Sequence, residues 1–97
     1  MKKKEMGNNE FQEKAVYLVK QFYKGLDTAD EEIDIYVVWI SKVLQNNKCL
    51  ISTSIPDGRY FEITYNGDKE EFYFDSYQKE INIRVANSDP LNISFNL

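Results

Sequence analysis

Few residues of this sequence could do chemistry, and histidine is not among them. The commonest metal ligand and general base of proteins is therefore missing. Cys49, the single cysteine, needs a nearby base or a depressed pKa to act as a nucleophile, and Lys48 points to the opposite side of the expected strand. The four scattered glycines form no phosphate-binding loop. We therefore expect Cys49 to be a buried core thiol, and we predict no catalytic residue, no metal site and no cofactor.

Glu62, Glu71 and Asp75 are the carboxylates that could act together. If the two flanking strands meet at a tight Asn66-Gly67 turn, Glu62 lies directly opposite Glu71. Like charges placed in this way destabilise a sheet, unless they bind a divalent cation or a basic group of a partner. Coupled carboxylates can also serve as general acid and base. A small hydrolase or metal-dependent nuclease is thus one alternative, beside the simpler interpretation that both side chains are exposed and screened.

A run of acidic residues forms a second charged feature. It holds five acids and no base within residues 27–34: Asp27, Asp30, Glu31, Glu32 and Asp34. Such a patch could mimic the phosphates of a nucleic acid or dock a basic surface of another protein. Its spacing lacks the regular pattern of a calcium-binding loop. A solvated connection between two elements is the alternative interpretation.

The length and charge of the chain restrict its class. Its 97 residues suffice for one domain, which we place at residues 9–97, after a flexible basic N-terminus at 1–8. Residues 1–24 carry a net charge of +3 and the remainder −7, for a total of −4. An acidic body disfavours nucleic acid as a partner. Because no apolar run resembles a secretory signal or a membrane span, we expect a cytoplasmic protein.

The spacing of apolar residues predicts one helix over residues 10–24. Asn9 is placed to cap its first turn, with Gln12 at the capping-box position, and Gly25 is a natural end. One apolar stripe recurs at helical spacing: Phe11, Ala15, Leu18, Val19, Phe22 and Leu26.

The rest of the chain predicts an antiparallel β-meander of five or six strands, so the fold class is α+β. The segment 33–44 also fits a helical face, but its β-branched and aromatic residues favour a strand. Further strands are expected at 48–55, 59–65, 68–75, 81–85 and 91–95. The turns between the first four are expected at 45–47, at Pro56-Asp57-Gly58, and at Asn66-Gly67, which is typical of a two-residue hairpin.

These turn lengths fix a register, with Phe61 opposite Phe72 and Cys49 opposite Tyr65, and divide the side chains between two faces. The face expected to receive the helix holds Val37, Trp39, Val43, Cys49, Ile51, Phe61, Ile63, Phe72 and Phe74. The second face holds Tyr36, Val38, Ile40, Leu50, Tyr60 and Tyr73, with Ser52, Glu62, Thr64 and Glu71 beside them. This second face is too apolar for an ordinary solvated sheet face. Either the C-terminal strands cover it, or it is a partner-binding surface.

Part of the chain, over roughly residues 34–80, resembles a family of small phage and prophage proteins of Gram-positive bacteria with no assigned function. The resemblance is carried by Tyr36-Val37-Val38-Trp39, Leu44-Gln45-Asn46, Ser52-Thr53, Pro56-Asp57-Gly58, Tyr60, Glu62-Ile63-Thr64-Tyr65-Asn66-Gly67-Asp68-Lys69, Asp75 and Tyr77. It transfers no functional residues, because none are defined in that family. It implies a phage accessory protein that acts inside the bacterial host cell, and such proteins often bind a host or defence protein.

Together these observations favour a non-enzymatic binding module. Its protein partner would contact the second face, at Tyr36, Val38, Ile40, Leu50, Tyr60, Glu62, Glu71 and Tyr73, and the nearby acidic patch. Two alternatives stay open beside the binding module: the carboxylate- or metal-dependent hydrolase or nuclease, and a structural homo-oligomer whose partner is a second copy of the chain.

Overall fold

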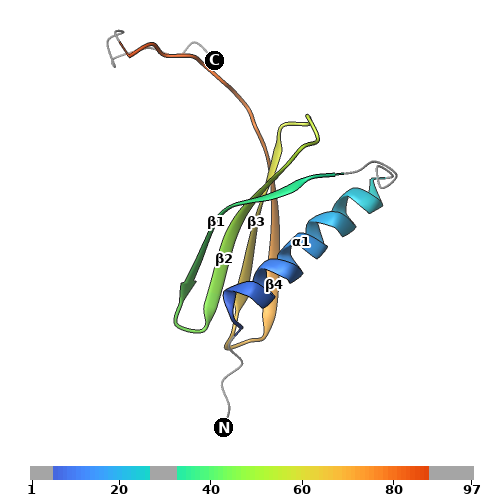
Figure 1. Ribbon diagram of the computed structural model, residues 1–97, viewed down its shortest axis with the longest axis vertical. Coiled ribbons are helices and arrows are strands. Elements are labelled where there is room, and N and C mark those ends of the chain that lie inside the picture. Colours follow the sequence, from blue (N-terminus) through green and yellow to red (C-terminus); the bar gives the residue numbers. More distant parts are fainter. Residues whose placement is uncertain (1–5, 27–32, 88–97) are drawn as a thin grey trace.

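The computed structural model describes residues 6–26 and 33–87, which form one helix and one open antiparallel sheet (Figure 1). The elements follow the chain as α1 (Asn8–Gly25), β1 (Ile35–Val43), β2 (Asn46–Thr53), β3 (Arg59–Asn66) and β4 (Glu71–Gln78). Neighbours in sequence are neighbours in the sheet, in the order β1-β2-β3-β4. The helix crosses one face of this sheet. The predicted α+β class and the antiparallel meander are confirmed.

The helix starts earlier than the sequence indicates and buries a strict i, i+4 ridge. Gly7 is the N-cap residue and its first turn has no side-chain cap, so the predicted capping role of Asn9 is wrong. The fully buried residues are Phe11, Ala15, Val19 and Tyr23. Tyr23 was not in the predicted stripe, whereas Leu26 follows the helix and is exposed. Among the described residues, no helix combines the length and hydropathy needed to cross a membrane.

The core lies between this ridge and the inner face of the sheet, and aromatic rings form much of it. Phe61 is its centre: the ring centroids of Phe22 and Tyr23 lie 5.1 and 5.7 Å from that of Phe61, both in edge-to-face geometry. Such pairs stabilise a core beyond the area that they bury. Met6 is buried with them, so the packed structure begins ahead of the helix.

The sheet has four strands in the described part of the chain, and not the five or six predicted. Residues 81–85 are extended but form no strand ladder. Their alternation of apolar and polar residues is typical of a strand, yet no described segment lies beside them to pair with. The predicted strand 91–95 lies outside the described residues.

The pairing of the last three strands differs from the predicted register by even numbers of residues. Phe61 lies opposite Ser76 instead of Phe72, and Cys49 lies opposite Ile63 instead of Tyr65. Because side chains alternate with a period of two, an even shift keeps each side chain on its predicted face. Ile51, Phe61 and the other predicted core residues of β2 and β3 are accordingly buried.

In the C-terminal half of β1, the register with β2 differs from the predicted one by an odd number of residues. The side chains of this half therefore lie on the face opposite to the predicted one. The turn to β2 comprises Leu44 and Gln45, and the register shifts again between Val37 and Trp39, where Val38 is the extra residue. Ile40 therefore lies opposite the buried Cys49, and Trp39 lies opposite Leu50. Trp39 and Val43, predicted for the core, are exposed, while Ile40, predicted for the second face, packs against the core.

Candidate functional site

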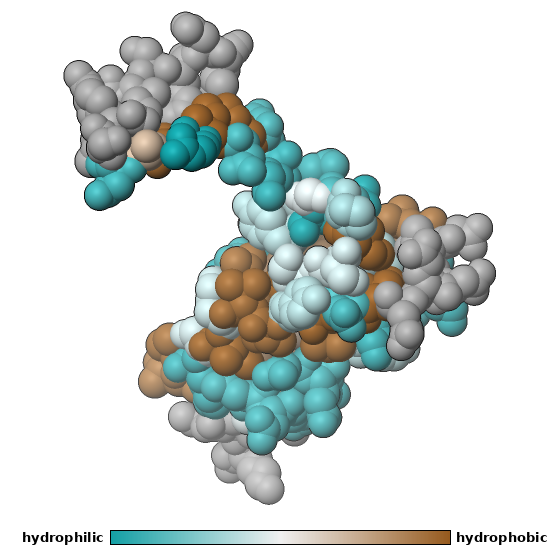
Figure 2. Space-filling model, turned by 45° about the horizontal axis from the view of Figure 1, so that its top comes forward, coloured by the Kyte–Doolittle hydropathy of each residue, from teal (hydrophilic) through white to brown (hydrophobic). Residues whose placement is uncertain are grey.

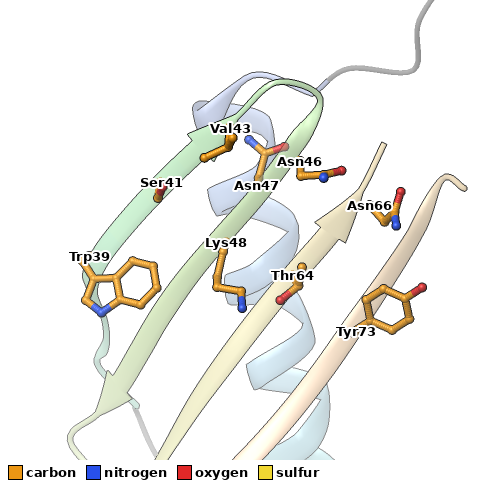
Figure 3. Close-up of a pocket in the computed structure, with 9 residues that line it drawn as sticks. All are labelled: Trp39, Ser41, Val43, Asn46, Asn47, Lys48, Thr64, Asn66 and Tyr73. Atoms are coloured by element: carbon orange, nitrogen blue, oxygen red, sulfur yellow. The ribbon is translucent and has the colours of Figure 1, made fainter. Parts of the chain in front are cut away.

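The sheet face turned away from α1, here called the outer face, carries exposed aromatic residues. Among the described residues, α1 is the only element outside the sheet, and it lies on the opposite side (Figures 1 and 3). The aromatic side chains of the outer face are between 39% and 51% exposed: Tyr36, Trp39, Tyr60, Tyr73 and Tyr77. Soluble proteins rarely leave so much contiguous apolar surface without an interaction partner.

Most residues predicted for this face lie on it. Those that the structure places there, or at the bulge beside it, are Tyr36, Val38, Leu50, Tyr60, Glu62, Glu71 and Tyr73. Ile40 does not belong to the face, because the two-residue turn to β2 places it opposite Cys49. Three apolar or aromatic residues of the face were missed: Trp39 and Val43, which the two-residue turn to β2 places outward, and Tyr77. The alternation of Tyr73, Asp75 and Tyr77 along β4 was the signal for Tyr77.

A shallow hollow of about 350 Å³ lies on the outer face, toward the end of the sheet that carries the β1–β2 loop, and spans all four strands (Figure 3). Trp39 on β1 and Tyr73 on β4 stand at its two sides, with Lys48 and Thr64 between them. Ser41, Val43, Asn46, Asn47 and Asn66 complete its lining. The walls are thus aromatic and apolar and the floor is polar, an arrangement typical of sites that fix an apolar group in one orientation.

Charges at the outer face are mostly negative. The ammonium group of Lys48 lies 3.8 Å from the carboxylate of Glu62, and Glu62 faces Asp75 across the ladder. The predicted pair of Glu62 and Glu71 does not form, because Glu71 lies opposite Asn66. Among the described residues, three carboxylates therefore share the face with one ammonium group, that of Lys48, and this part of the surface is acidic.

Tyr77 connects the aromatic and the charged parts of the outer face. Its ring stacks on that of Tyr60, with centroids 5.3 Å apart and an interplanar angle of 18°. Its hydroxyl donates a hydrogen bond to Oε1 of Glu62 over 3.4 Å. The negative charge of Glu62, with some burial and the charge of Asp75, raises the pKa of Tyr77. The hydroxyl of Tyr77 is thereby kept as a neutral donor at the surface.

Of the groups considered for catalysis, Glu62 and Asp75 face each other, whereas Cys49 and Glu71 lie apart from that pair. Cys49 is fully buried on the inner face, as expected, and burial raises the pKa of its thiol to about 11. Glu71 and Asp75 lie four residues apart on β4, about 13 Å along the strand. In residues 6–26 and 33–87, no three histidine, cysteine, aspartate or glutamate side chains converge in a way that could hold a metal ion.

The predicted acidic patch is described only at its last member. Asp34 is exposed, and its backbone N–H donates to Oγ of Ser54 over 3.0 Å while its carbonyl accepts from the N–H of Ser54 over 2.9 Å. Asp27, Asp30, Glu31 and Glu32 lie outside the described residues. The structure therefore positions the start of β1, but not the patch as a whole.

Comparison with known proteins places this architecture in a family. The sequence profile of a family of unknown function, DUF6275, matches residues 8–87. This range contains α1, all four strands and the segment that follows β4. No curated protein and no solved structure is significantly similar to the chain.

Proposed function

The chain belongs to the DUF6275 family of unknown function, and from its structure we propose that it is a non-enzymatic module that binds a protein partner on the outer face. One observation carries the proposal: in the described part of the chain, an aromatic sheet face is left without any covering element. The opposite face is covered by α1 and forms the core. The described part of the chain thus folds around one face and leaves the other uncovered.

The chemistry of the outer face suits a protein interface. Trp and Tyr are enriched among the residues that dominate binding energy, and here Trp39 and Tyr73 flank a hollow that can receive an apolar side chain of the partner. The stacked pair of Tyr60 and Tyr77 extends the aromatic surface along β3 and β4. Rings of this type offer a large contact area at a low cost in side-chain entropy.

The charge of the face restricts the partner. Glu62, Asp75 and Glu71 outnumber Lys48, and the chain as a whole carries a charge of −4. Complementary charge steers association and rejects wrong partners. We therefore propose a partner that inserts an apolar side chain between Trp39 and Tyr73 and carries lysine or arginine around it. A nucleic acid would meet repulsion at the same place.

We also propose a biological context for the protein. The resemblance to small phage and prophage proteins of Gram-positive bacteria supports an accessory protein in the cytoplasm of a bacterial host cell, acting on a host or defence protein. For the alternative, a carboxylate-dependent hydrolase or nuclease, the facing carboxylates would be Glu62 and Asp75 in place of Glu62 and Glu71.

The experiment compares three baits in affinity purification from the bacterium that encodes the protein, with identification by mass spectrometry. The baits are the unchanged protein, a Tyr60→Ser/Tyr73→Ser double variant, and a Tyr17→Ser control. Tyr17 is 59% exposed on α1, away from the outer face, so its replacement removes a surface tyrosine and leaves the outer face unchanged. We expect one protein to bind the unchanged and the control baits and to be lost from the double variant.

The captured protein is then purified, and its dissociation constant is measured for each bait. Losing two aromatic contacts at the centre of an interface should weaken binding at least about 30-fold, since each residue of this kind contributes roughly 1 kcal/mol or more. Circular dichroism must show that the double variant is folded. Equal binding by all three baits would mean that the partner uses another surface.

A further inference from the structure

Residues 79–87, here called the arm, continue β4 beyond the end of the sheet (Figure 1). The N–H of Lys79 donates to the carbonyl of Gly58 over 2.6 Å, which ties the start of the arm to the loop between β2 and β3. From Glu80 to Val85 no backbone group makes a hydrogen bond in the described part of the chain. Six consecutive residues therefore present a complete set of unused ladder groups.

The side chains of the arm alternate as they do in a strand. Ile81, Ile83 and Val85 are 46%, 46% and 41% exposed, and polar residues occupy the positions between them. Figure 2 shows the resulting sequence of brown and teal side chains between the body and the grey terminal residues. A β-branched, alternating segment with unpaired backbone is a template for pairing with another strand.

We propose that the arm pairs antiparallel with the arm of a second copy, with Asn82 facing Asn82 across a two-fold axis. The dimer contact is independent of the outer face, so this inference does not depend on the proposed function. A two-fold contact of this kind uses the same segment twice and closes on itself. It also satisfies, along one edge, backbone groups that Glu80–Val85 leave unpaired within the described part of one copy.

The charges of the arm favour a second copy of the chain as the partner, with Asn82 on the axis. With Asn82 on the axis, Glu80 of each copy lies opposite Arg84 of the other, and Ile81 lies opposite Ile83. Two ion pairs and two apolar pairs form at once, each on its own side of the ribbon. Centring the ribbon on Ile83 instead would place Glu80 opposite Ala86 and leave the charges unpaired. A shift of one residue would place isoleucine opposite arginine.

The folded bodies make the pairing feasible. An isolated two-stranded ribbon is marginal in water, but each arm here grows directly out of β4 and has its direction fixed by the sheet. The overlap of residues 79–85 is about 20 Å long, which keeps the two bodies at opposite ends. The dimer therefore carries two separate outer faces. A partner protein that presents two or more copies of its binding site could contact both faces at once and would be bound more tightly through avidity.

Charge reversal tests the register. Glu80→Arg places arginine opposite arginine at two positions, and Arg84→Glu places glutamate opposite glutamate. Each variant alone should raise the dimer dissociation constant at least about tenfold. Mixed in equal amounts, the two variants regain both ion pairs and should form a heterodimer as tight as the unchanged dimer. Analytical ultracentrifugation measures all three states, with Lys14→Glu on the exposed side of α1 as the control for net charge.

Disulfide trapping tests the position of the axis. Across an antiparallel pair the Cα atoms of facing residues are about 4.5–5.5 Å apart, within the range that a disulfide spans. Asn82→Cys should therefore form a covalent dimer on mild oxidation, because the native Cys49 is buried. Lys69→Cys, exposed in the loop between β3 and β4, is the matched control and should stay monomeric on denaturing gels.

Three results would overturn the proposal. The unchanged protein could be a monomer at all concentrations reached in the centrifuge. The dimer could persist in both charge-reversed variants, which would place the contact elsewhere. The mixture of the two variants could remain monomeric, which would exclude the pairing of Glu80 with Arg84.

Discussion

Gly67 lies directly against the backbone of Gln45: a Cβ at position 67 would stand 2.3 Å from the carbonyl oxygen of Gln45 and 2.8 Å from its Cβ. The two residues belong to different hairpin loops, one between β1 and β2 and one between β3 and β4. Hydrogen bonds hold the loops in this contact. The N–H of Gly67 donates to Oδ1 of Asn46 over 3.0 Å, and the amide of Gln45 donates to the carboxylate of Asp68. The absence of a side chain at position 67 lets the two hairpins touch.

Gly67→Ala should therefore destabilise the fold. The added methyl group meets backbone, which cannot move aside as a flexible side chain would, and such overpacking costs about 1–3 kcal/mol. Each kcal/mol lowers the Tm of a domain of this size by about 4–8 °C. Thermal unfolding followed by circular dichroism measures the effect. Gly25→Ala is the control, since a Cβ there meets nothing within 4 Å; equal Tm values for the two variants would contradict the close contact.

The same glycine illustrates what the sequence could and could not predict. Asn66-Gly67 predicted a two-residue turn, but Asn66 closes a four-residue loop instead. Its side-chain oxygen accepts hydrogen bonds from the N–H groups of Asp68 and Lys69, over 3.0 and 3.2 Å, and Glu70 takes a φ of 53°. The need for glycine arises from the neighbouring loop, and a contact between distant segments leaves no local sequence pattern.

The residues of the candidate site were predicted correctly wherever the predicted and observed registers differ by an even number of residues. Tyr60, Glu62 and Tyr73 lie on the predicted face although both of their ladders are shifted, because period-two alternation survives such shifts. In β1 the error is odd, since the turn places Leu44 at a φ of 57°. Leucine rarely adopts that conformation, and nothing in its neighbours indicates it. Trp39, a wall of the hollow, was for this reason assigned to the core.

Asp57 should make the stability of the fold sensitive to acid. Burial favours its neutral form, but hydrogen bonds from the Arg59 N–H, the Tyr23 hydroxyl and the Arg59 guanidinium outweigh this, and the pKa of Asp57 is lowered from 3.8. A lowered pKa means that the stabilisation is present above pH 3.8 and is lost as the pH falls through the pKa of the folded state. Asp57→Asn should thus be less stable than the unchanged protein at pH 7, with a difference that shrinks on acidification.

Urea unfolding across the acidic range measures this difference in free energy. Tyr23→Phe is the informative companion, because it removes only the hydroxyl that donates to Asp57 over 2.9 Å. It should raise the pKa of Asp57 and begin the acid-induced loss of stability at a higher pH. A gap between Asp57→Asn and the unchanged protein that is constant with pH would show that the hydrogen bonds do not depend on the charge.

Cys49 should be unreactive until the protein unfolds. Burial raises the pKa of its thiol from 9.0 to about 11, so little thiolate exists at pH 8, and the side chain is inaccessible. A raised pKa also means that the stabilisation from the neutral thiol is complete below pH 9 and is lost as the pH rises toward 11. Titration with a thiol reagent at pH 8, with and without urea, checks the first statement.

Unfolding of Cys49→Ala between pH 9 and 11 checks the second statement. Tyr23 and Tyr65 also have pKa values raised by burial, so some alkaline loss of stability remains in the variant. The slope with pH should nevertheless be smaller than in the unchanged protein. Rapid labelling of Cys49 in the folded state would contradict its burial on the inner face.

Trp39 and Ile40 test the bulge at Val38, on which the shape of the outer face depends. Trp39 is 42% exposed opposite Leu50, so Trp39→Ala should cost less than about 1 kcal/mol of folding free energy. Ile40 packs against the core opposite Cys49, and Ile40→Ala should cost about 2–3 kcal/mol, because it leaves unfilled space beside buried residues. Urea unfolding measures both variants by circular dichroism. A larger loss of folding free energy in Trp39→Ala than in Ile40→Ala would mean that Trp39 lies in the core. The hollow would then lack one wall, and the proposed partner site would be wrong.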